Sequence, residues 1–303
     1  MDLSVLNGRG AIVTGGGSGI SLAFVKLLFQ AGCNVLIADL RLHSEAEEFI
    51  NSIGSRSDLA TKGSDGTRIA FHKTNVTVWK ELENLFDVYK SEFGGVPYIV
   101  CCGAGLYEPT TKGWWDEKDD DDTYLLFRVN VFHPMKLCRI ALRKWLGANA
   151  EGIICFISST SAQKASIVTP LYQPSKHAIS CFTRSMAPLQ DLCGVRSCAV
   201  APGLTASPML FGSAATLKLF DPEKDTERLA TPQAVAEGLM AVAMDREHYP
   251  PGTVLEVTGP NGRRVVNMLN DPGPAANTFL TGKTVGLQDV KAWIEKERAG
   301  SIS

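Results

Sequence analysis

Short, continuous apolar runs alternate along the chain with longer segments in which apolar residues recur every three or four positions. The runs of strand length lie at residues 10–14, 33–38, 68–73, 98–102, 151–158, 195–201 and 254–258. The segments of helical period lie at residues 20–31, 45–53, 124–146 and 172–189, and a further helix opens at residue 231. Because strands that alternate with helices build parallel sheets, the pattern predicts an α/β protein with a doubly wound parallel sheet and helices on both faces.

The pattern continues to residue 265, and no internal repeat or second core is visible. We therefore expect a single domain over residues 1–265 and a C-terminal extension over residues 266–303. In the extension the composition shifts to Asn, Pro and Gly, and a polar helix at residues 287–298 ends the chain. That tail would be an appendage or an oligomer contact. Residues 204–225 follow neither period, which suits a mobile flap over a bound molecule.

A glycine-rich turn follows the first strand and opens the first helix. Its residues are Gly15-Gly16-Gly17-Ser18-Gly19-Ile20. The strand after that helix ends at Asp39, and this order of strand, glycine turn, helix, strand and acid is the dinucleotide-binding unit of a Rossmann fold. Glycines let the backbone approach a pyrophosphate, whose charge the helix N-terminus favours. We expect Gly15, Ser18, Gly19 and Ile20 to bind such a cofactor; the alternative is a plain connecting turn.

Asp39 also indicates which nicotinamide dinucleotide the chain binds. Its carboxylate can accept hydrogen bonds from both ribose hydroxyls of NAD, and it would repel the 2′-phosphate of NADP. Arg41, two residues further on, could offset that repulsion. We therefore expect NAD in preference to NADP.

Small or polar residues follow the other predicted strands. Gly103 and Ala104 would let the sheet edge approach a flat cofactor ring, unless they form only a strand-ending turn. The carboxyl ends of parallel strands meet at one edge of a sheet, where ligands bind. The residues at or just after these strand ends are Asp39, Asn75, Gly103, Ser159 and Pro202. The scattered motifs therefore converge on one crevice, with cofactor and substrate sites together in the single domain.

A Tyr and a Lys stand four residues apart at the start of the helix predicted at residues 172–189. On a helix, Tyr172 and Lys176 project from one face. The ammonium would favour the phenolate and lower the phenol pKa from about 10 towards neutrality. Ser159, which follows the preceding strand, could hold a substrate oxygen. These residues would make a site for oxidising an alcohol or reducing a carbonyl; the alternative is an amphipathic helix with an exposed Lys.

Composition and charge argue against several other classes. The chain has 45% hydrophobic and 20% charged residues and a net charge of −2, which gives no electrostatic case for nucleic acid. No apolar run approaches the roughly 18 residues of a membrane span, and the N-terminus has no signal-peptide pattern. The eight cysteines lie mostly in apolar segments without C-x-x-C spacing, and the five histidines are scattered. We therefore expect a reducing, cytoplasmic setting and no metal.

Trp114-Trp115 and the acidic run at residues 116–122 have no clear role in this scheme. The run suits the start of a helix on a solvated face better than a cation site. The tryptophans could roof the substrate crevice or meet a partner subunit.

Taken together, these motifs make the chain resemble the short-chain dehydrogenase/reductase family over residues 7–260. The residues that carry the resemblance are Thr14-Gly15-x-x-x-Gly19-Ile20, Asp39, Asn130, Ser159, Tyr172-x-x-x-Lys176 and Pro202-Gly203. The stretches at residues 38–42 and 102–109 are similar to those of fungal members related to 15-hydroxyprostaglandin dehydrogenase, many of which belong to secondary metabolism.

The resemblance implies a role for each matching residue. Tyr172 would be the general acid/base, Lys176 would lower its pKa and bind the nicotinamide ribose, and Ser159 would orient the substrate oxygen. Asn130 would hold a water in a proton relay from Lys176. The implied cofactor contacts are Asp39 at the adenine ribose and Asn75 and Val76 near the adenine. Tyr172, Lys176, Pro202 and Gly203 would also bind the cofactor, and Thr205 and Ser207 would face its nicotinamide end.

Three departures from the family pattern affect cofactor seating. Ser21 stands where a third glycine is usual, so helix and strand would sit slightly apart. Asn75 replaces an Asp and changes the adenine contact from acceptor-only to mixed. Cys102-Gly103 replaces an Asn pair and removes side-chain bonds that steady the central strand. None of these removes the proton-transfer group, so we expect an active enzyme.

The sequence thus predicts an oxidoreductase that transfers a hydride between NAD(H) and a secondary alcohol or ketone of a hydrophobic small molecule, such as a secondary-metabolite intermediate. The alternatives are an NADPH-dependent ketoreductase, a biosynthetic member that also steers cyclisation and, in another class, a non-catalytic dinucleotide-binding scaffold. The family implies a homodimer or homotetramer. Nothing points to nucleic acid or a membrane as a partner.

Overall fold

The apolar runs form the strands of one sheet in the computed structural model, which describes residues 2–54, 56–57, 60–63, 66–108, 114, 123–259, 262–267 and 283–300. The strands are β1 (Gly10–Thr14), β2 (Asn34–Asp39), β3 (Arg56–Ser57), β4 (Ala60–Lys62), β5 (Arg68–Lys73), β6 (Ile99–Cys102), β7 (Gly152–Ile157), β8 (Val195–Pro202), β9 (Val254–Thr258) and β10 (Gly262–Val265). Their order across the sheet is β10-β9-β8-β7-β6-β1-β2-β5-β4-β3. The winding direction reverses between β1 and β6, which is where a doubly wound sheet binds its ligands.

The centre of the sheet is parallel, as predicted. β1 pairs with β2 and β6, β2 pairs with β5, and β6 to β9 pair in turn, all in parallel. The two edges differ from the prediction. β10 pairs antiparallel with β9, and β3 and β4 form an antiparallel hairpin on β5, in a segment where we predicted no strand. These edge strands are short and mostly polar, so no apolar run announces them.

The helices cover both faces of the sheet. They are η1 (Ser4–Leu6), α1 (Gly19–Gln30), α2 (Ser44–Ile53), α3 (Trp79–Phe93), α4 (Leu125–Phe127), η4 (Arg128–Phe132), α5 (His133–Gly147), η5 (Thr160–Gln163), α6 (Tyr172–Ser185), α7 (Leu189–Cys193), α8 (Pro208–Phe211), α9 (Ala214–Leu217), α10 (Pro222–Asp225), η6 (Thr226–Arg228), α11 (Pro232–Met244) and α12 (Lys283–Arg298). α3 was not predicted, although its buried Leu82, Leu85, Phe86 and Tyr89 follow the helical period.

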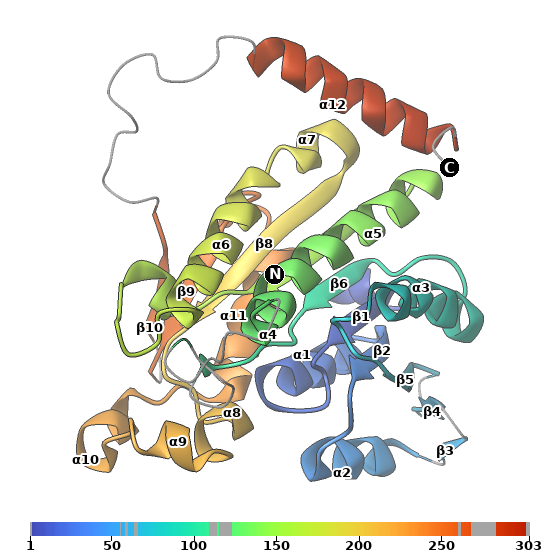
Figure 1. Ribbon diagram of the computed structural model, residues 1–303. Coiled ribbons are helices and arrows are strands. Elements are labelled where there is room, and N and C mark those ends of the chain that lie inside the picture. Colours follow the sequence, from blue (N-terminus) through green and yellow to red (C-terminus); the bar gives the residue numbers. More distant parts are fainter. Residues whose placement is uncertain are drawn as a thin grey trace.

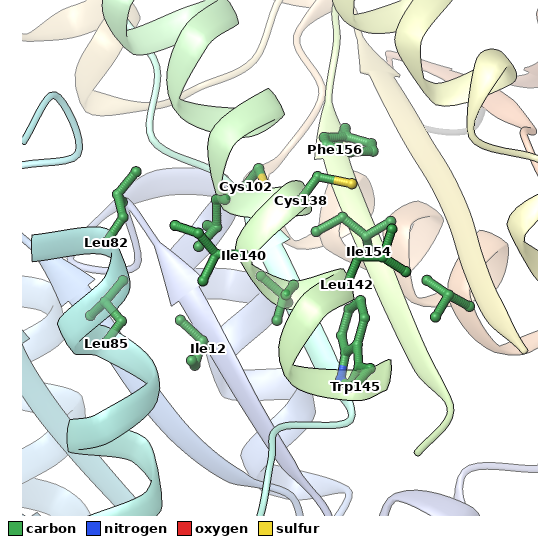
Figure 2. Close-up of a cluster of buried hydrophobic side chains, with 14 of the residues drawn as sticks. Ile12, Leu82, Leu85, Cys102, Cys138, Ile140, Leu142, Trp145, Ile154 and Phe156 are labelled. Atoms are coloured by element: carbon green, nitrogen blue, oxygen red, sulfur yellow. The ribbon is translucent and has the colours of Figure 1, made fainter. Parts of the chain in front are cut away.

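Alternate residues of the central strands feed two cores. On β1, Ile12 packs in one cluster with Leu82 of α3 and Trp145 of α5. Val13, the next residue, packs in the other cluster with Phe24 of α1 and Leu239 of α11. Figure 1 shows α5 and α6 on one side of the strands and α1 and α11 on the other, and Figure 2 shows the cluster around Trp145. This two-sided burial explains why the central strands read as continuous apolar runs.

The helix predicted at residues 124–146 is present, but it is not α-helical throughout. It consists of α4, a π-helical turn (η4) and α5, and Asn130 lies in the middle of that turn. The helix predicted at residues 172–189 ends at Ser185, and the short α7 follows it. The other predicted helices are present with boundaries that shift by a few residues.

Near the end of the described residues, α12 packs on α5 of the same chain, and Figure 1 shows it in red across the end of that helix. The carboxylate of Glu297 accepts hydrogen bonds from Arg139 at 3.1 Å and from Arg143 at 3.3 Å. Ile294, which is 3% exposed, joins the core that contains Trp145. Nothing in the described part of α12 or of any other helix is long and apolar enough to cross a membrane.

Candidate active site

A cavity of about 1480 Å³ opens at the carboxyl ends of the central strands. The predicted site residues that line it are Gly15, Ser18, Gly19, Ile20, Asp39, Asn75, Val76, Gly103, Ala104, Ser159, Tyr172, Lys176, Pro202, Gly203, Thr205 and Ser207. Asn130 is not among the lining residues, because its side chain is 2% exposed and lies against Gly105. The structure therefore brings all but one of these residues to a single cavity.

The glycine turn lies against the end of β6. Gly15 has a φ of +67°, a conformation that favours glycine, and a Cβ there would lie 2.7 Å from the backbone of Ala104. Ser18 is the N-cap residue of α1, and Gly19 begins that helix. The turn therefore lines the cavity at the N-terminus of a 12-residue helix, which favours a phosphate group.

Asp39 ends β2, and the backbone holds its carboxylate in place. Oδ2 accepts a hydrogen bond from the N–H of Gly17 at 2.9 Å, and Oδ1 accepts one from the N–H of Leu40 at 2.7 Å. Each carboxylate oxygen has a further lone pair that can accept a hydroxyl hydrogen. The acid is therefore fixed at the cavity wall, in a form that can accept hydrogen bonds from a ribose.

Asn75 forms a local turn after β5. Its Oδ1 accepts hydrogen bonds from the N–H of Thr77 at 3.0 Å and from the Thr77 hydroxyl at 2.8 Å. Its own N–H donates to Glu81, in the first turn of α3, at 2.6 Å. The side-chain oxygen thus serves the turn, and Val76, 8% exposed, follows it at the cavity wall.

Ser159 and Tyr172 approach each other from two segments. Ser159 precedes η5, where its Oγ accepts a hydrogen bond from the N–H of Ser161 at 3.1 Å and donates to the carbonyl of Pro202 at 3.4 Å. Tyr172 is the first residue of α6 and is 8% exposed. Its burial raises the pKa of the phenol to about 12, while a hydrogen bond with Ser159 lowers it and nearby Tyr107 raises it. The phenol is therefore protonated at neutral pH.

Lys176 lies one turn further along α6, on the same side as Tyr172. Its Nζ donates to the carbonyl of Ile157 at 2.9 Å and lies 5.6 Å from the centroid of the Tyr172 ring. Burial lowers the pKa of Lys176 to about 8. We expected the ammonium to lower the phenol pKa, and the shift of Tyr172 is in the other direction. Burial of the phenol dominates because Nζ bonds a carbonyl rather than the phenol oxygen.

The side chain of Asn130, in the π-helical turn, is held by hydrogen bonds to two other segments. Its Oδ1 accepts a hydrogen bond from the N–H of Leu106 at 2.8 Å, and its Nδ2 donates to the carbonyl of Leu106 at 2.9 Å. Nδ2 also lies 3.2 Å from the hydroxyl oxygen of Ser175 in α6. A Cβ placed on Gly105 would lie 3.6 Å from Asn130 Oδ1 and 3.7 Å from Lys176 Nζ. Asn130 and Lys176 therefore meet the same small residue, and the relay between them stays a prediction.

The segment at residues 204–225 contains short helices, where we expected an irregular stretch. Pro208 and Pro222 each begin a helix of four residues, α8 and α10, and α9 lies between them. Figure 1 shows these helices in orange, gathered beside the sheet. Thr205, 7% exposed, donates to the carbonyl of Gly203 at 3.0 Å, and Ser207 stands at the N-cap position of α8 without a side-chain capping bond. The mobility predicted for the flap at residues 204–225 stays a prediction.

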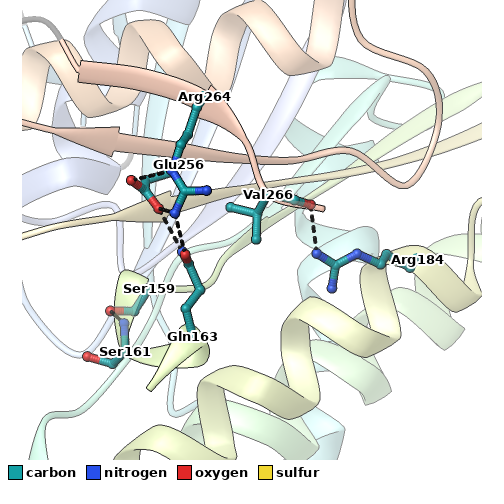
Figure 3. A network of polar contacts seen from close by, with 7 residues as sticks. All are labelled: Ser159, Ser161, Gln163, Arg184, Glu256, Arg264 and Val266. Atoms are coloured by element: carbon teal, nitrogen blue, oxygen red, sulfur yellow. Dashed lines mark hydrogen bonds and ion pairs between the residues drawn. The ribbon is translucent and has the colours of Figure 1, made fainter. Parts of the chain in front are cut away.

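A polar network lies at the other rim of the cavity (Figure 3). Arg264 of β10 donates to both oxygens of Glu256, at 3.0 and 2.7 Å, and to Gln163 of η5 at 2.8 Å. Gln163 in turn donates to Glu256 at 2.9 Å. The unpredicted antiparallel strand β10 thereby contacts the segment that follows Ser159.

Glu108 is a residue that the sequence reasoning missed. Its side chain is 4% exposed, and its Oε2 accepts hydrogen bonds from the N–H groups of Leu171 at 2.9 Å and Tyr172 at 3.0 Å. Its Oε1 accepts from the N–H of Trp114 at 3.2 Å. The carboxylate therefore caps the start of α6, where Tyr172 lies. The partner N–H groups are more than sixty residues away along the chain, so no local spacing could have revealed this contact.

Two of the departures from the family pattern fit each other. A Cβ on Gly103 would lie 2.2 Å from Ser21 Oγ and 2.7 Å from the carbonyl oxygen of Thr14. Ser21 therefore occupies space that a larger residue at position 103 would need. The hydroxyl of Thr14 accepts hydrogen bonds from the N–H of Gly103 at 3.0 Å and from that of Ala104 at 3.4 Å. The end of the central strand is thus steadied through its backbone.

These features suit a nicotinamide dinucleotide. The glycine turn lines the cavity at a helix N-terminus, Asp39 offers acceptors for a ribose, and Gly103 and Ala104 line the same cavity as Tyr172 and Lys176. Trp115 and residues 116–122 lie outside the described residues. Within the described residues, no group of three or more His, Cys, Asp or Glu side chains could hold a metal ion.

Comparison with known proteins agrees with this site. The family model "short chain dehydrogenase" matches residues 9–217. The cis-4-hydroxycyclohexanecarboxylate dehydrogenase of Sinomonas cyclohexanicum is 28% identical over 83% of this chain and 95% of its own. The 3beta-hydroxysteroid dehydrogenase 2 of Eggerthella lenta is 27% identical over 84% and 95%. A short-chain type dehydrogenase/reductase of Mycobacterium marinum shares the fold, with a TM-score of 0.69, 22% identity and coverage of 84% and 96%. The chain therefore belongs to the short-chain dehydrogenase family and is an NAD(P)-dependent oxidoreductase acting on alcohols.

Proposed function

We propose that the chain transfers a hydride between NAD(H) and a secondary alcohol or ketone of a hydrophobic small molecule, and that Tyr172 exchanges the proton. The observation that carries this proposal is that Tyr172, Ser159 and Lys176 line the same cavity as Asp39 and the glycine turn. A substrate oxygen at the phenol and a dinucleotide along the turn would therefore share one space.

The residues of the chain divide the work of alcohol oxidation. The carbinol C–H bond breaks with its electron pair, and the O–H proton passes to Tyr172 as general base. A bound nicotinamide ring supplies the hydride acceptor. Ser159 orients the substrate oxygen, Lys176 holds the nicotinamide ribose, and Asn130 supports the proton relay. In ketone reduction, Tyr172 gives the proton to the carbonyl oxygen.

The raised pKa of Tyr172 supports the reductive direction at neutral pH. Because burial raises that pKa to about 12, the phenol is present in the form that donates a proton. Alcohol oxidation needs the phenolate, whose fraction rises with pH. This observation also favours ketone reduction as the second candidate function.

Asp39 supports NAD over NADP. Its carboxylate is fixed by the N–H groups of Gly17 and Leu40, so it cannot turn away from a 2′-phosphate without breaking two charge-assisted hydrogen bonds. Arg41 is exposed, and its guanidinium has the charge that a 2′-phosphate would need. The balance of these two residues decides the preference, and the fixed carboxylate favours NAD.

The flap supports a hydrophobic substrate. Met209, Leu219 and Phe220 line the cavity, and Met209 and Leu219 are 39% and 50% exposed. Apolar side chains at a cavity mouth bind apolar ligands. The two relatives named above, one for a hydroxycyclohexanecarboxylate and one for a hydroxysteroid, also support an alcohol on a largely hydrocarbon molecule. A secondary-metabolite intermediate is one such molecule.

We also propose a cytoplasmic homodimer or homotetramer. All eight cysteines are free, and seven of them are buried, which suits a reducing compartment. Light scattering of the purified chain tests the oligomer, and a monomer at micromolar concentration would contradict this part of the proposal.

Turnover of the purified protein tests the function. A panel of hydrophobic secondary alcohols and their ketones is offered with NAD(H) and with NADP(H), and the nicotinamide absorbance is followed. We expect turnover with at least one alcohol–ketone pair and a higher kcat/KM with NAD(H). Binding of NADH without turnover of any pair, in a protein that is fully folded, would favour the non-catalytic scaffold instead.

A further inference from the structure

The π-helical turn η4 leaves one backbone carbonyl without its usual donors. In an α-helix, the N–H of His133 would donate to the carbonyl of Val129, four residues back. Here the N–H of His133 donates to Arg128, five residues back. The next possible donor, five residues after Val129, is residue 134, and it is a proline with no N–H. Val129 therefore has neither of these two backbone partners.

The side chain of His133 supplies the missing donor. It is 1% exposed, and its Nδ1 lies 3.1 Å from the carbonyl oxygen of Val129. A carbonyl only accepts, so Nδ1 carries the hydrogen and Nε2 of the neutral ring is an acceptor. Burial and the nearby charge of Lys176 lower the pKa of His133, to about 4, which keeps the ring neutral. The geometry therefore fixes one tautomer.

The acceptor Nε2 contacts the strand that precedes the glycine turn. It lies 3.1 Å from the hydroxyl oxygen of Thr14, at the end of β1. The carbonyl of Cys101, at 3.2 Å, competes for the same hydroxyl hydrogen. A fully buried ring nitrogen that accepts no hydrogen bond costs free energy of folding, so we place the Thr14 hydroxyl hydrogen on the bond to Nε2. The hydroxyl then receives the N–H groups of Gly103 and Ala104 on its lone pairs.

Pro134 acts on the other side of the same turn. In a regular α-helix, its ring would collide with the carbonyl of Asn130, four residues earlier. The π-helical turn adds a residue at this point and relieves the collision. It is this turn that presents the side chain of Asn130 to Leu106 and Ser175. Pro134 thus favours the π-helical turn, and His133 donates a hydrogen bond to the Val129 carbonyl that the turn leaves without a backbone donor.

We propose that His133 and Pro134 are positioning residues that set Asn130 and tie it, through Thr14, to the Gly103-Ala104 edge of the cavity. The proposal rests on the proposed function, in which Asn130 serves the proton relay and the Gly103-Ala104 edge faces the nicotinamide. His133 touches neither cofactor nor substrate, and it acts through the residues that do.

Pro134→Ala is the first test, because it does not threaten folding. Alanine restores an N–H and removes the ring that opposes the α-helix, so the helix can become regular and Asn130 moves. We expect kcat to fall about 10-fold, while Tm stays the same or rises and the Kd for NADH is unchanged. If Pro134 served only the structure of the helix, Pro134→Ala would raise Tm and leave kcat intact. That result would overturn the proposal.

Two substitutions of His133 separate its two contacts. The amide of His133→Asn can replace Nδ1 and keep the bond to Val129, and the amide of His133→Gln can replace Nε2 and keep the bond to Thr14. We expect His133→Asn to keep most of kcat and to bind NADH more weakly, and His133→Gln to show the reverse. His133→Phe should lose both, with kcat reduced about 10-fold or more. Equal behaviour of the three variants would contradict the proposal.

Leu142→Ala is the matched control, since this residue is buried in α5 and distant in sequence from η4. It should lower Tm and leave kcat unchanged well below Tm. A proportional loss of kcat would mean that any damage to α5 has the same effect, against our inference.

Nitrogen NMR of the labelled His133 imidazole measures its tautomer and so tests the inference without an activity assay. We expect the Nδ1–H tautomer in the wild-type protein across neutral pH. The Nε2–H tautomer would overturn the inference whatever the activity. If instead the Nδ1–H tautomer is found but no alcohol or ketone is turned over, the proposed function fails while the described geometry stands.

Discussion

The two ends of the cavity are held by opposite means. At the Asp39 end, backbone N–H groups of Gly17 and Leu40 fix a side chain. At the Tyr172 end, buried side chains fix backbone: Glu108 holds the N–H groups at the start of α6, and Asn130 holds both polar groups of Leu106. The contact of Gly17 with Asp39 spans 22 residues and that of Leu106 with Asn130 spans 24, and the residues that make these contacts differ between the two ends. The two ends should therefore fail separately when either is damaged.

Glu108→Ala should break the catalytic end and spare the cofactor end. It leaves the N–H groups of Leu171 and Tyr172 without their buried acceptor, so the first turn of α6 loosens and Tyr172 moves. We expect kcat to fall about 30-fold, with the Kd for NADH nearly unchanged. Glu108→Gln keeps an acceptor oxygen and should recover most of the rate. Stopped-flow assays and NADH titration measure both quantities, and an equal loss in the two variants would disprove the capping role.

Asp39→Asn should alter the cofactor end and spare the catalytic end. The amide removes the negative charge that repels a 2′-phosphate. We expect the ratio of kcat/KM for NADP to that for NAD to rise about 10-fold, with kcat for NAD changed little. Asp191→Asn, an exposed change on α7, is the control. An unaltered ratio would show that Asp39 does not set the preference.

Gly103→Ala tests the contact of Gly103 with Ser21 and Thr14, which lies between the two ends of the cavity. The added methyl group would meet Ser21 Oγ and the Thr14 carbonyl, so we expect the free energy of unfolding to fall by about 2 kcal/mol. Adding Ser21→Gly should restore about 1 kcal/mol, since it removes one of these two contacts. Urea unfolding measures both effects. Gly147→Ala, where a Cβ would have nothing within 4 Å, should be harmless. If the effects of Gly103→Ala and Ser21→Gly on the free energy of unfolding were strictly additive, the two residues would not be fitted to each other.

Acid titration sharpens the comparison further. The pKa of His133 is about 4 in the folded chain and near 6.5 in the unfolded chain. The folded state therefore binds this proton less readily, and the stability involved is complete above pH 6.5 and is lost as pH falls towards 4. Over that window, the wild-type free energy of unfolding should fall more steeply than that of His133→Asn, by up to about 1.4 kcal/mol per pH unit. Parallel curves from urea unfolding at several pH values would contradict a buried neutral imidazole.

The same contrast explains how much could be predicted from the sequence. The central strands, the glycine turn and Asp39 were all predicted, because each depends on a few consecutive residues. α3 could have been predicted from the helical spacing of Leu82, Leu85 and Phe86. The hairpin of β3 and β4 could not, because these short strands are defined only by their partner β5.

The supporting residues of the catalytic end were beyond sequence reasoning for a related cause. Glu108 meets Tyr172 across 64 residues, and His133 meets Thr14 across 119. Ser21 and Gly103 each looked like a separate departure until the structure placed them in contact. The direction of the Tyr172 pKa also depends on burial, which the Tyr-x-x-x-Lys spacing does not reveal.

The central claim is that Tyr172 exchanges the proton beside a bound nicotinamide. The most direct measurement is the rate of the first turnover in Tyr172→Phe, followed as NADH appears from NAD and an alcohol that the wild-type protein oxidises. The phenyl ring keeps the packing and removes only the hydroxyl, so the account predicts an unchanged Kd for NADH and a rate at least about 100-fold lower. A first turnover at close to the wild-type rate, with the same NADH affinity, would contradict it.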